Sequence, residues 1–491
     1  MRTLLLVPAC CAILAVRSQD TCSCTHVLDR FIGKVERNYA GYQDKVATAT
    51  RDGYEALKDS LIGLAAGTED KSRCFHLLDR YRAYFRDKHL QLAGAYAHAE
   101  DGTDPAPPRT SAWTAATLDQ RFTIHREELR TLEGLWSLDA YRVGLVYNDS
   151  LRAYDAIIAA SQNPNWKEGM VKFNVTEPVE GQAHVHYWRG DLKTMETVAV
   201  FASGHLAVKG VGTWHMVQAP AGSMGALDFE LNYGEEVQWR MLDDSTLYIK
   251  LGSFDLRNKA LLDSLVHANK ALLDRTPYWI VDLRGNGGGS TDVFAALLPY
   301  LYTRPMEDFG ADHWMSPENT ALLKAWAEAN APMLPTRTTR YLRNLVKYGE
   351  RHPNTWFREK GGTEQHDKVM PMPERVAILA DHGTASSGES FLFVARGMSG
   401  KSLIFGENSG GYMDYGDLQS HFLGCDGLVT SIPTARMNRI DHGMRFDIDG
   451  IAPDERIGKE VQDWIAVVRI HWAAHPVRRA ARGGERPVPV H

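Results

Sequence analysis

Residues 376–390 read VAILADHGTASSGES, and this stretch decides which fold the chain adopts. Its first five residues, Val376 to Ala380, form a continuous apolar run bounded by turn residues, which is typical of a buried strand. Asp381 to Ala385 form the turn, and a helix is predicted to begin near Ser387. Ser386 is therefore expected where a buried strand turns into a helix.

The same texture continues on both sides of this stretch. Apolar runs predict strands at residues 247–251, 278–281, 376–380 and 403–405, and helices are predicted at about 258–273 and 387–396. Strands that alternate with helices are typical of an α/β protein, so a mostly parallel sheet under helices is expected.

Ser386 is a candidate nucleophile because of this position. Backbone N–H groups at a helix start, including that of Ser387, can face the oxyanion that forms when a serine attacks a carbonyl. The local pattern also fits a purely structural role, in which Thr384 or Ser386 caps the helix and Glu389 completes a capping box.

A glycine-rich loop, DLRGNGGG at residues 282–289, follows the predicted strand 278–281. It lies at a strand's carboxyl end, where α/β sheets bind ligands. The nucleotide-binding patterns GxxxxGK[ST] and GxGxxG are absent. We expect Gly287 or Gly288 to supply a second oxyanion donor, with a plain tight turn as the alternative.

Five motifs in this order resemble the C-terminal processing and tricorn-type serine peptidase family, over about residues 236–460. They are residues 248–251 (YIKL), 282–289 (DLRGNGGG), 384–389 (TASSGE), 406–411 (GENSGG) and 449–454 (DGIAPD). The resemblance implies a crotonase-like (ClpP-type) α/β core, a serine nucleophile at Ser386 and hydrolysis of peptide bonds.

The base is expected to be a histidine. Family members with a Ser/Lys dyad carry a lysine just after the loop at 406–411, but this chain has no lysine between Lys401 and Lys459. Residues 86–92 (RDKHLQL) resemble the Asp-x-His segment of the tricorn-like branch, which implies His89. An imidazole can accept the serine proton at neutral pH and return it to the leaving amine. His382, four residues before Ser386, is the second candidate.

For the third catalytic member, the family places an acid three residues before the glycine of its Gly-Val/Ile-x-Pro-Asp motif, which is Asp447 in this chain. Such a carboxylate would orient His89. Asp449 and Asp87 are alternatives, because the side chain of Asp447 is shorter than that of the glutamate that the family usually has at this position.

The rest of the chain suggests several further segments. We expect a signal peptide at 1–18, an N-terminal helical domain with His89 at 19–98, and a linker at 99–115. Alternating short runs predict a small β-rich middle domain at 116–235, followed by the crotonase-like peptidase core at 236–470 and a basic disordered tail at 471–491.

The charge, the hydropathy and the cysteines of the chain bear on its partners, its compartment and its disulfides. The 61 acidic and 55 basic side chains leave a net charge of −6, too small a bias to indicate nucleic acid or a membrane surface as partner. No transmembrane stretch follows the leader, so an exported protein of the periplasm or the medium is expected. Without the leader, Cys22, Cys24, Cys74 and Cys425 remain, either with Cys22 or Cys24 paired to Cys74 or as free thiols.

The expected function is that of a serine peptidase acting on a peptide or protein, without metal or organic cofactor. The main alternative is a non-catalytic protein on the same core that binds small hydrophobic molecules. A crotonase-type enzyme acting on acyl thioesters is a third hypothesis, but it needs neither a seryl nucleophile nor a leader peptide.

Overall fold

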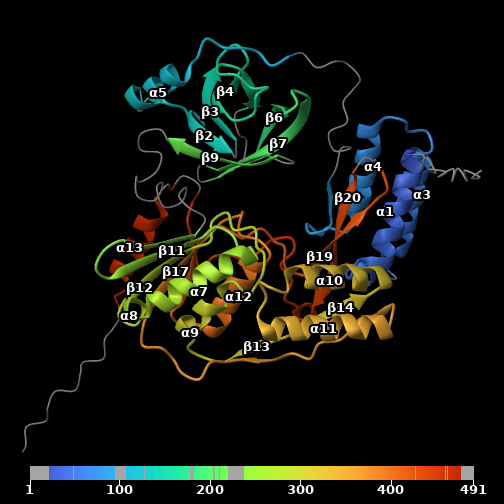
Figure 1. Cartoon of the computed structure of the whole chain (residues 1–491), viewed down its shortest axis with the longest axis vertical. Helices are drawn as coiled ribbons and strands as arrows, with labels where there is room; N and C mark the ends of the chain where they lie inside the picture. The colour runs from blue at the N-terminus through green and yellow to red at the C-terminus, as the bar shows by residue number, and fades with distance from the viewer. Residues whose placement is uncertain are drawn as a thin grey trace, which may run out of the picture.

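The computed structural model (Figure 1) describes residues 22–47, 49–93, 107–125, 128–138, 140–176, 182–202, 205–208, 211–218, 237–425, 427–458, 461 and 463–476. The predicted leader at 1–18 and the part of the predicted tail beyond residue 476 lie outside these ranges.

A six-stranded sheet forms the centre of the C-terminal region. Its strands, in spatial order, are β10 (Val237–Met241), β11 (Thr246–Leu251), β12 (Tyr278–Asp282), β17 (Arg375–Ala380), β18 (Ser402–Gly406) and β21 (Glu455–Arg456). Only β10 runs antiparallel to its neighbour. Ile249, Val281, Ile378 and Ile404 lie in register across the sheet. The prediction of a mostly parallel sheet is confirmed.

Helices cover both faces of this sheet, which explains why its strands read as unbroken apolar runs. One face packs against α7 (Lys259–Ala268), α8 (Lys270–Leu273), η4 (Phe294–Leu297), α9 (Leu298–Leu301) and α12 (Ser387–Met398). The short η3 (Leu256–Asn258) directly precedes α7. The other face packs against α13 (Trp464–Ala474) through Trp464, Ile465 and Val468. A disordered tail from residue 471 is therefore wrong for residues 471–474: Trp472 packs against Tyr278 and holds the helix end on the sheet.

A second sheet joins strands from distant parts of the chain. It contains β1 (Gln91–Ala93), β20 (Val429–Met437), β14 (Ala311–Met315) and β15 (Thr355–Phe357) in that order, and β19 (Tyr415–Phe422) also pairs with β20. All its pairings are antiparallel. The helices α10 (Pro317–Asn330) and α11 (Thr336–Arg351) lie beside this sheet. The short helix η5 (Asn438–His442) follows β20. A separate two-stranded sheet pairs β13 (Met306–Asp308) with β16 (Gly362–Glu364).

The N-terminal helices pack on this second sheet. They are α1 (Cys24–Asn38), α2 (Tyr42–Lys45), α3 (Arg51–Ala65) and α4 (Lys71–Tyr84). Phe31, Tyr81 and Phe85 share one apolar cluster with Tyr415 and Ile432 of the C-terminal region. The helices at 24–84 consequently bury their apolar faces against residues more than 300 positions away, and not only against one another.

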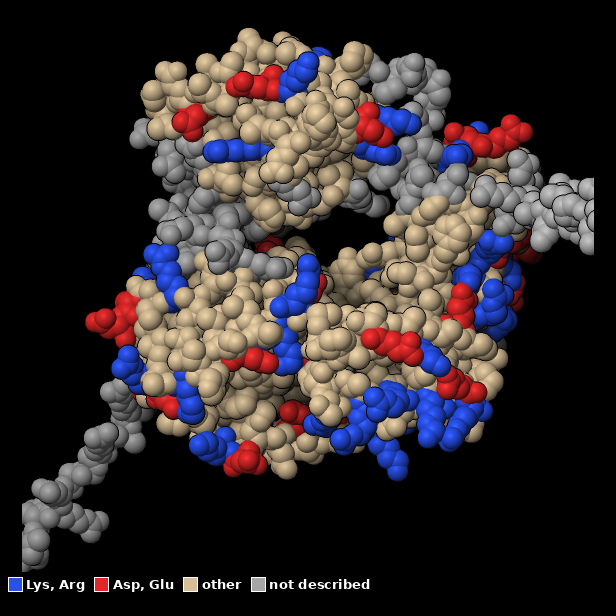
Figure 2. Space-filling model, in the orientation of Figure 1, with Lys and Arg blue, Asp and Glu red and all other residues tan. Residues whose placement is uncertain are grey.

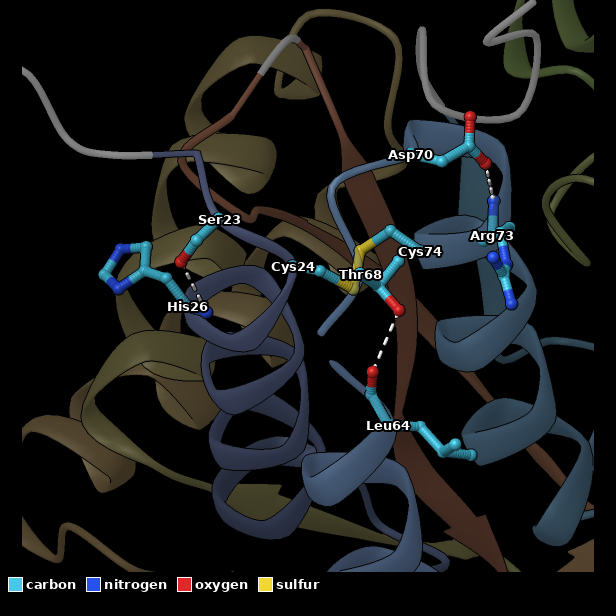
Figure 3. Close-up of a disulfide and its surroundings, with 8 residues drawn as sticks. All are labelled: Ser23, Cys24, His26, Leu64, Thr68, Asp70, Arg73 and Cys74. Carbon is cyan, nitrogen blue, oxygen red and sulfur yellow. Dashed lines mark hydrogen bonds between the residues drawn. A yellow bond between two sulfur atoms is a disulfide. The ribbon is translucent and has the colours of Figure 1, made fainter. Parts of the chain in front are cut away.

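Two disulfides fasten this region. Cys24, the first residue of α1, pairs with Cys74 near the start of α4 (Figure 3). Cys22 pairs with Cys425 across a separation of 403 residues. Ser23 and Asp70 cap the two helices beside the first disulfide by accepting from the backbone N–H groups of His26 and Arg73. Of the pairings left open by the sequence, Cys24 with Cys74 is present.

Residues 134–218 form a closed barrel of eight strands, set apart from the two sheets in Figure 1. The strands are β2 (Gly134–Leu138), β3 (Tyr141–Asn148), β4 (Ala153–Ser161), β5 (Val171–Thr176), β6 (Gln182–Trp188), β7 (Thr194–Ala202), β8 (His205–Val208) and β9 (Gly212–Gln218). Helix α5 (Ala115–Ile124) adds Leu118 and Phe122 to the barrel core.

Removal of the long-range disulfide tests how firmly the N-terminal region is held. We expect Cys22→Ser with Cys425→Ser to lower the free energy of unfolding by about 2–4 kcal/mol, because the bond restricts the unfolded chain over a very long loop. Guanidinium unfolding followed by tryptophan fluorescence measures this, with Cys24→Ser/Cys74→Ser as the matched pair. An unchanged unfolding curve for the first pair would contradict the bond.

Candidate active site

Ser386 lies at the turn between β17 and α12, as the sequence predicts. It is the N-cap of α12, with φ 53° and ψ −119°. This positive φ is rare for a residue with a side chain, and such strained positions gather at functional sites. The backbone of this turn is therefore strained, whereas that of an ordinary helix cap is not.

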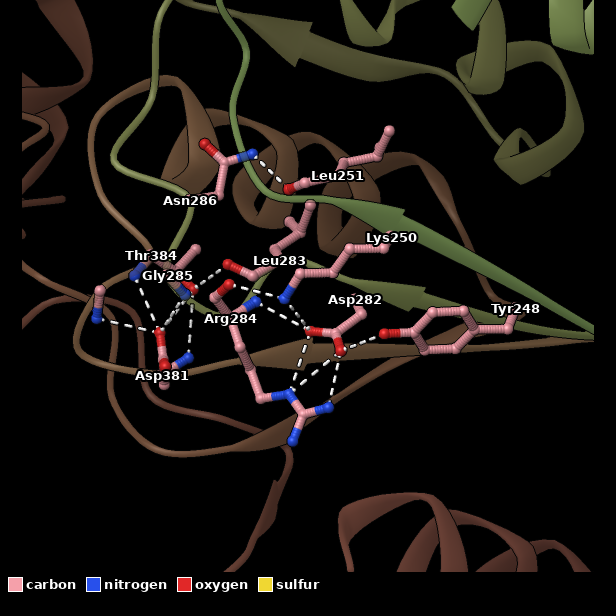
Figure 4. Close-up of polar contacts among 11 residues, drawn as sticks. Tyr248, Lys250, Leu251, Asp282, Leu283, Arg284, Gly285, Asn286, Asp381 and Thr384 are labelled. Carbon is pink, nitrogen blue, oxygen red and sulfur yellow. Dashed lines mark hydrogen bonds and ion pairs between the residues drawn. The ribbon is translucent and has the colours of Figure 1, made fainter. Parts of the chain in front are cut away.

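The Ser386 turn and the glycine-rich loop are tied together by backbone contacts (Figure 4). The Asp381 carboxylate accepts from the N–H groups of Gly285 at 2.9 Å, Gly383 at 2.9 Å and Thr384 at 3.1 Å. Thr384 Oγ1 donates to the Leu283 carbonyl at 2.8 Å. The turn at Ser386 therefore cannot move without the loop.

A buried ion cluster holds the start of this loop. Asp282, fully buried, accepts from Arg284 Nη2 at 2.7 Å and from Tyr248 OH at 2.7 Å, and Lys250 Nζ lies 3.4 Å away (Figure 4). Burial alone would raise the pKa of Asp282, but the positive charges of Arg284 and Lys250 outweigh it and hold that pKa well below its usual range. The carboxylate stays charged and fixes the direction in which the loop leaves β12.

The glycine-rich loop lies directly against the serine. A Cβ built on Gly288 would stand 2.8 Å from Ser386 Cβ and 3.0 Å from Ser387 N, and Gly288 has φ +103°. The Gly288 N–H donates to Asn286 Oδ1 at 2.8 Å. For the N–H groups of Gly287 and Ser387 no acceptor is found in the described part of the chain, so of the two predicted glycines Gly287 has the available donor.

Glu389 links Ser386, the candidate nucleophile, to the loop at 409–412. Its side chain is fully buried and accepts four hydrogen bonds. The donors are Ser386 N at 2.9 Å, Ser409 Oγ at 2.5 Å, Gly411 N at 2.8 Å and Tyr412 N at 2.7 Å. The sequence pattern indicated only the first contact, as part of a capping box.

His89 is buried in the segment that follows α4. Its Nδ1 lies 2.7 Å from the Tyr415 carbonyl oxygen, and its ring packs edge-on against Tyr412 at 5.2 Å. A carbonyl only accepts, so Nδ1 carries the proton and Nε2 keeps its lone pair. Among the described residues, no hydrogen bond joins His89 to Ser386; Tyr412, which touches His89 by its ring and Glu389 by its N–H, connects the two sides.

None of the three candidate acids, all of them in the described ranges, hydrogen-bonds the His89 ring. Asp447 is buried, and its Oδ1 accepts from Met413 N at 3.0 Å and Asp414 N at 2.6 Å. Asp87 accepts from the His89 backbone N–H at 2.8 Å and from Tyr39 OH at 2.7 Å. Asp449 is exposed.

The Asp447 carboxyl is electrostatically unusual. Its Oδ2 is buried without a hydrogen-bond partner among the residues that the structure describes. Burial, with the negative charges of Asp87 and Asp414 nearby, raises the pKa of Asp447 to about 7. Burial also raises the pKa of Asp87. Two buried carboxyls thus flank the segment that carries His89.

His382, the second candidate base, is exposed and has no hydrogen bond to Ser386 within the described part of the chain. It lines a pocket of about 380 Å³ with Glu407, Asn408, Arg456, Ile457 and Gly458, at the carboxyl ends of β18 and β21. In the described ranges, no group of three or more His, Cys, Asp or Glu residues has the arrangement of a metal site.

Comparison with known proteins gives one match to a family. Residues 245–457 match the model of Peptidase family S41. No curated protein sequence matches the chain.

Several solved structures are similar at low identity. Mature CPAF is 12% identical with a TM-score of 0.45, over 88% of this chain and 93% of that one. The photosystem II D1 C-terminal processing protease is 12% identical with a TM-score of 0.37, over 90% and 94% of the two chains. A lipoprotein from Streptococcus agalactiae is 11% identical with a TM-score of 0.38, over 97% and 100%. These TM-scores are too low to establish a common overall fold.

The two neighbouring glycines offer a matched pair of variants. Gly288→Ala is expected to lower kcat/KM for peptide hydrolysis at least about 100-fold, because its Cβ would displace Ser386 from its position. Gly287→Ala should keep most of the activity, since no atom lies within 4 Å of the place that its new methyl group would take, and the N–H remains. Equal losses in both variants would contradict the close approach of residue 288 to the nucleophile.

The raised pKa of Asp447 predicts a pH-dependent stability. The folded-state pKa of Asp447, about 7, exceeds its ordinary value of 3.8. The contribution of this carboxyl to the stability of the folded state is therefore full below about pH 4 and is lost as the pH rises through about 7. Asparagine cannot lose a proton, so the free energy of unfolding of Asp447→Asn, relative to that of the unchanged chain, should be larger at about pH 8 than at about pH 5. Urea unfolding of both proteins at both pH values measures this difference, and a constant difference would rule out the raised pKa.

Proposed function

We propose that this chain, whose residues 245–457 belong to peptidase family S41 and which is a serine-type peptidase, cleaves peptide bonds through an acyl-enzyme on Ser386. The observation that carries the proposal is the strained Ser386 at the start of α12, with the glycine-rich loop against it. A crotonase-like core is part of the proposal, supported by the parallel strands β11, β12, β17 and β18 under α7 and α12.

In this mechanism Ser386 Oγ attacks the carbonyl carbon of the scissile bond. The tetrahedral oxyanion would accept hydrogen bonds from Ser387 N–H and Gly287 N–H, which have no acceptor of their own in the described part of the chain. Gly288 contributes space: its missing side chain leaves room beside Ser386 Cβ.

His89 is the proposed base. With Nδ1 donating to the Tyr415 carbonyl, Nε2 is the nitrogen that would take the Ser386 proton and return it to the leaving amine. The two residues share no hydrogen bond in the described part of the chain, so binding of substrate would have to bring them into contact.

The acid is proposed to act through the backbone. Asp447 holds Met413 N and Asp414 N, and so fixes the segment whose Tyr415 carbonyl holds the His89 ring. Asp87 holds the His89 backbone N–H. Both are positioning residues in this account, and Asp447 keeps the orienting role that the sequence predicts for it.

Export to the periplasm or the medium is also proposed. The two disulfides, Cys22–Cys425 and Cys24–Cys74, favour an oxidising compartment. Across the described ranges, no helix has both the length and the apolar character needed to cross a bilayer. The substrate would be a peptide or protein of that compartment.

One observation favours the alternative of a non-catalytic binding protein: no hydrogen bond joins His89 and Ser386 in the described ranges. Hydrolysis of a mixed peptide library, read by mass spectrometry, decides between the two. Ser386→Ala should abolish cleavage, and His89→Ala should lower kcat/KM by about 1,000-fold or more. His382→Ala is the matched histidine control and should cleave as the unchanged chain does.

Cleavage that survives Ser386→Ala, or that is lost in His382→Ala and kept in His89→Ala, would contradict these roles. A folded unchanged chain that cleaves nothing but binds apolar ligands would favour the binding protein.

A further inference from the structure

Helix α11 carries a row of positive charges. Arg337, Arg340, Arg343, Lys347 and Arg351 are all exposed, and their spacing of three and four residues places them on one face of the helix. Figure 2 shows the blue side chains gathered along the lower right edge of the molecule, over α11. The row runs from residue 337 to residue 351, or about 21 Å at the rise of an α-helix.

Carboxylates do not neutralise this row. Among the described residues, no Asp or Glu oxygen lies within 4.0 Å of any of the five cationic groups. Glu350, the one acidic residue within α11, pairs with Lys324 of α10 at 2.9 Å. By contrast, Lys259 of α7 and Lys270 of α8 each meet an aspartate four residues further on.

The arrangement costs helix stability. Four successive pairs of like charges, from residue 337 to residue 351, repel one another at spacings of three or four residues. In a chain with more acidic than basic side chains and a net charge of −6, such a gathering is not a product of overall composition. A partner that brings negative charge to this face would remove the repulsion.

We propose that the outward face of α11 docks the protein on an anionic lipid surface. Four of the five cations are arginines, whose planar guanidinium group binds phosphate oxygens in pairs. The apolar side of α11 is already packed, with Leu345, Val346 and Gly349 buried, so the helix docks by charge and does not insert.

Two further observations favour a membrane over an acidic peptide. The cations lie along one exposed face of a helix of 16 residues, which suits a flat anionic surface better than an extended acidic peptide. Trp326 on α10 and Met333, four residues before Arg337, are each 42% exposed, and proteins that rest at a membrane interface combine exposed large apolar side chains with cations. The proposal is independent of the peptidase activity.

Sedimentation of the purified chain with lipid vesicles tests the proposal. At low salt the chain should bind vesicles of phosphatidylcholine with about one third phosphatidylglycerol, should ignore pure phosphatidylcholine, and should release at about 0.5 M salt. Arg337→Gln/Arg340→Gln/Arg343→Gln should weaken binding about 100-fold, at about fivefold per cation. Replacement of the same three arginines by lysine should retain most of it.

A control with the same change in net charge separates the row from general attraction. Arg142→Gln/Lys167→Gln/Lys368→Gln removes three exposed cations elsewhere and should bind as the unchanged chain does. Circular dichroism and thermal unfolding of all variants confirm that they are folded. Failure of the unchanged chain to bind, equal losses in both triple variants, or binding to polyglutamate without binding to vesicles would overturn the proposal.

Discussion

The candidate site depends on the carboxylate of Glu389. This one buried group accepts from the backbone N–H of Ser386, the candidate nucleophile, and from three donors of the loop at 409–412. Because a buried carboxylate needs all of its partners, these two segments hold each other in place. The strained φ of Ser386 can persist because the surrounding contacts, from Glu389 and from Asp381, leave the turn no other arrangement.

The loop that Glu389 fixes also leads to His89. Tyr412 packs on the His89 ring, and the Tyr415 carbonyl holds its Nδ1. His89 itself follows the N-terminal helices, which share a core with the second sheet and are bound to it by Cys22–Cys425. The N-terminal region is consequently part of the site's framework, and anything that loosens it would move the proposed base.

The sequence predicted the parts whose signals are local. The runs at 376–380 and 278–281 are apolar throughout because their sheet is covered on both faces, so the strands, the turn at Ser386 and the start of α12 could all be predicted. The second sheet could not, since only β19 and β20 are neighbours in the chain and the other strands, β1, β14 and β15, join them through long-range pairings. Alternating short runs indicated a β-rich domain at 116–235 but carry no sign that its strands close into a barrel.

The candidate site divides in the same way. Ser386, the glycine-rich loop and His89 could be named from motifs, and the structure places Gly288 against Ser386. The partner of the His89 ring could not be predicted, because it is a backbone carbonyl, a group that every residue carries. The choice between Gly287 and Gly288 as donor needed the side chain of Asn286, which occupies one of the two N–H groups.

Ser386 as an activated nucleophile, with His89 as its base, is the central claim. The most direct measurement is labelling of the folded chain with a fluorophosphonate, followed by peptide mapping, because the reagent reacts with an activated serine and needs no knowledge of the substrate. The account predicts label on Ser386 alone, lost in Ser386→Ala, strongly reduced in His89→Ala and unchanged in His382→Ala. A folded chain that takes up no label, or takes it up at another serine, would contradict it.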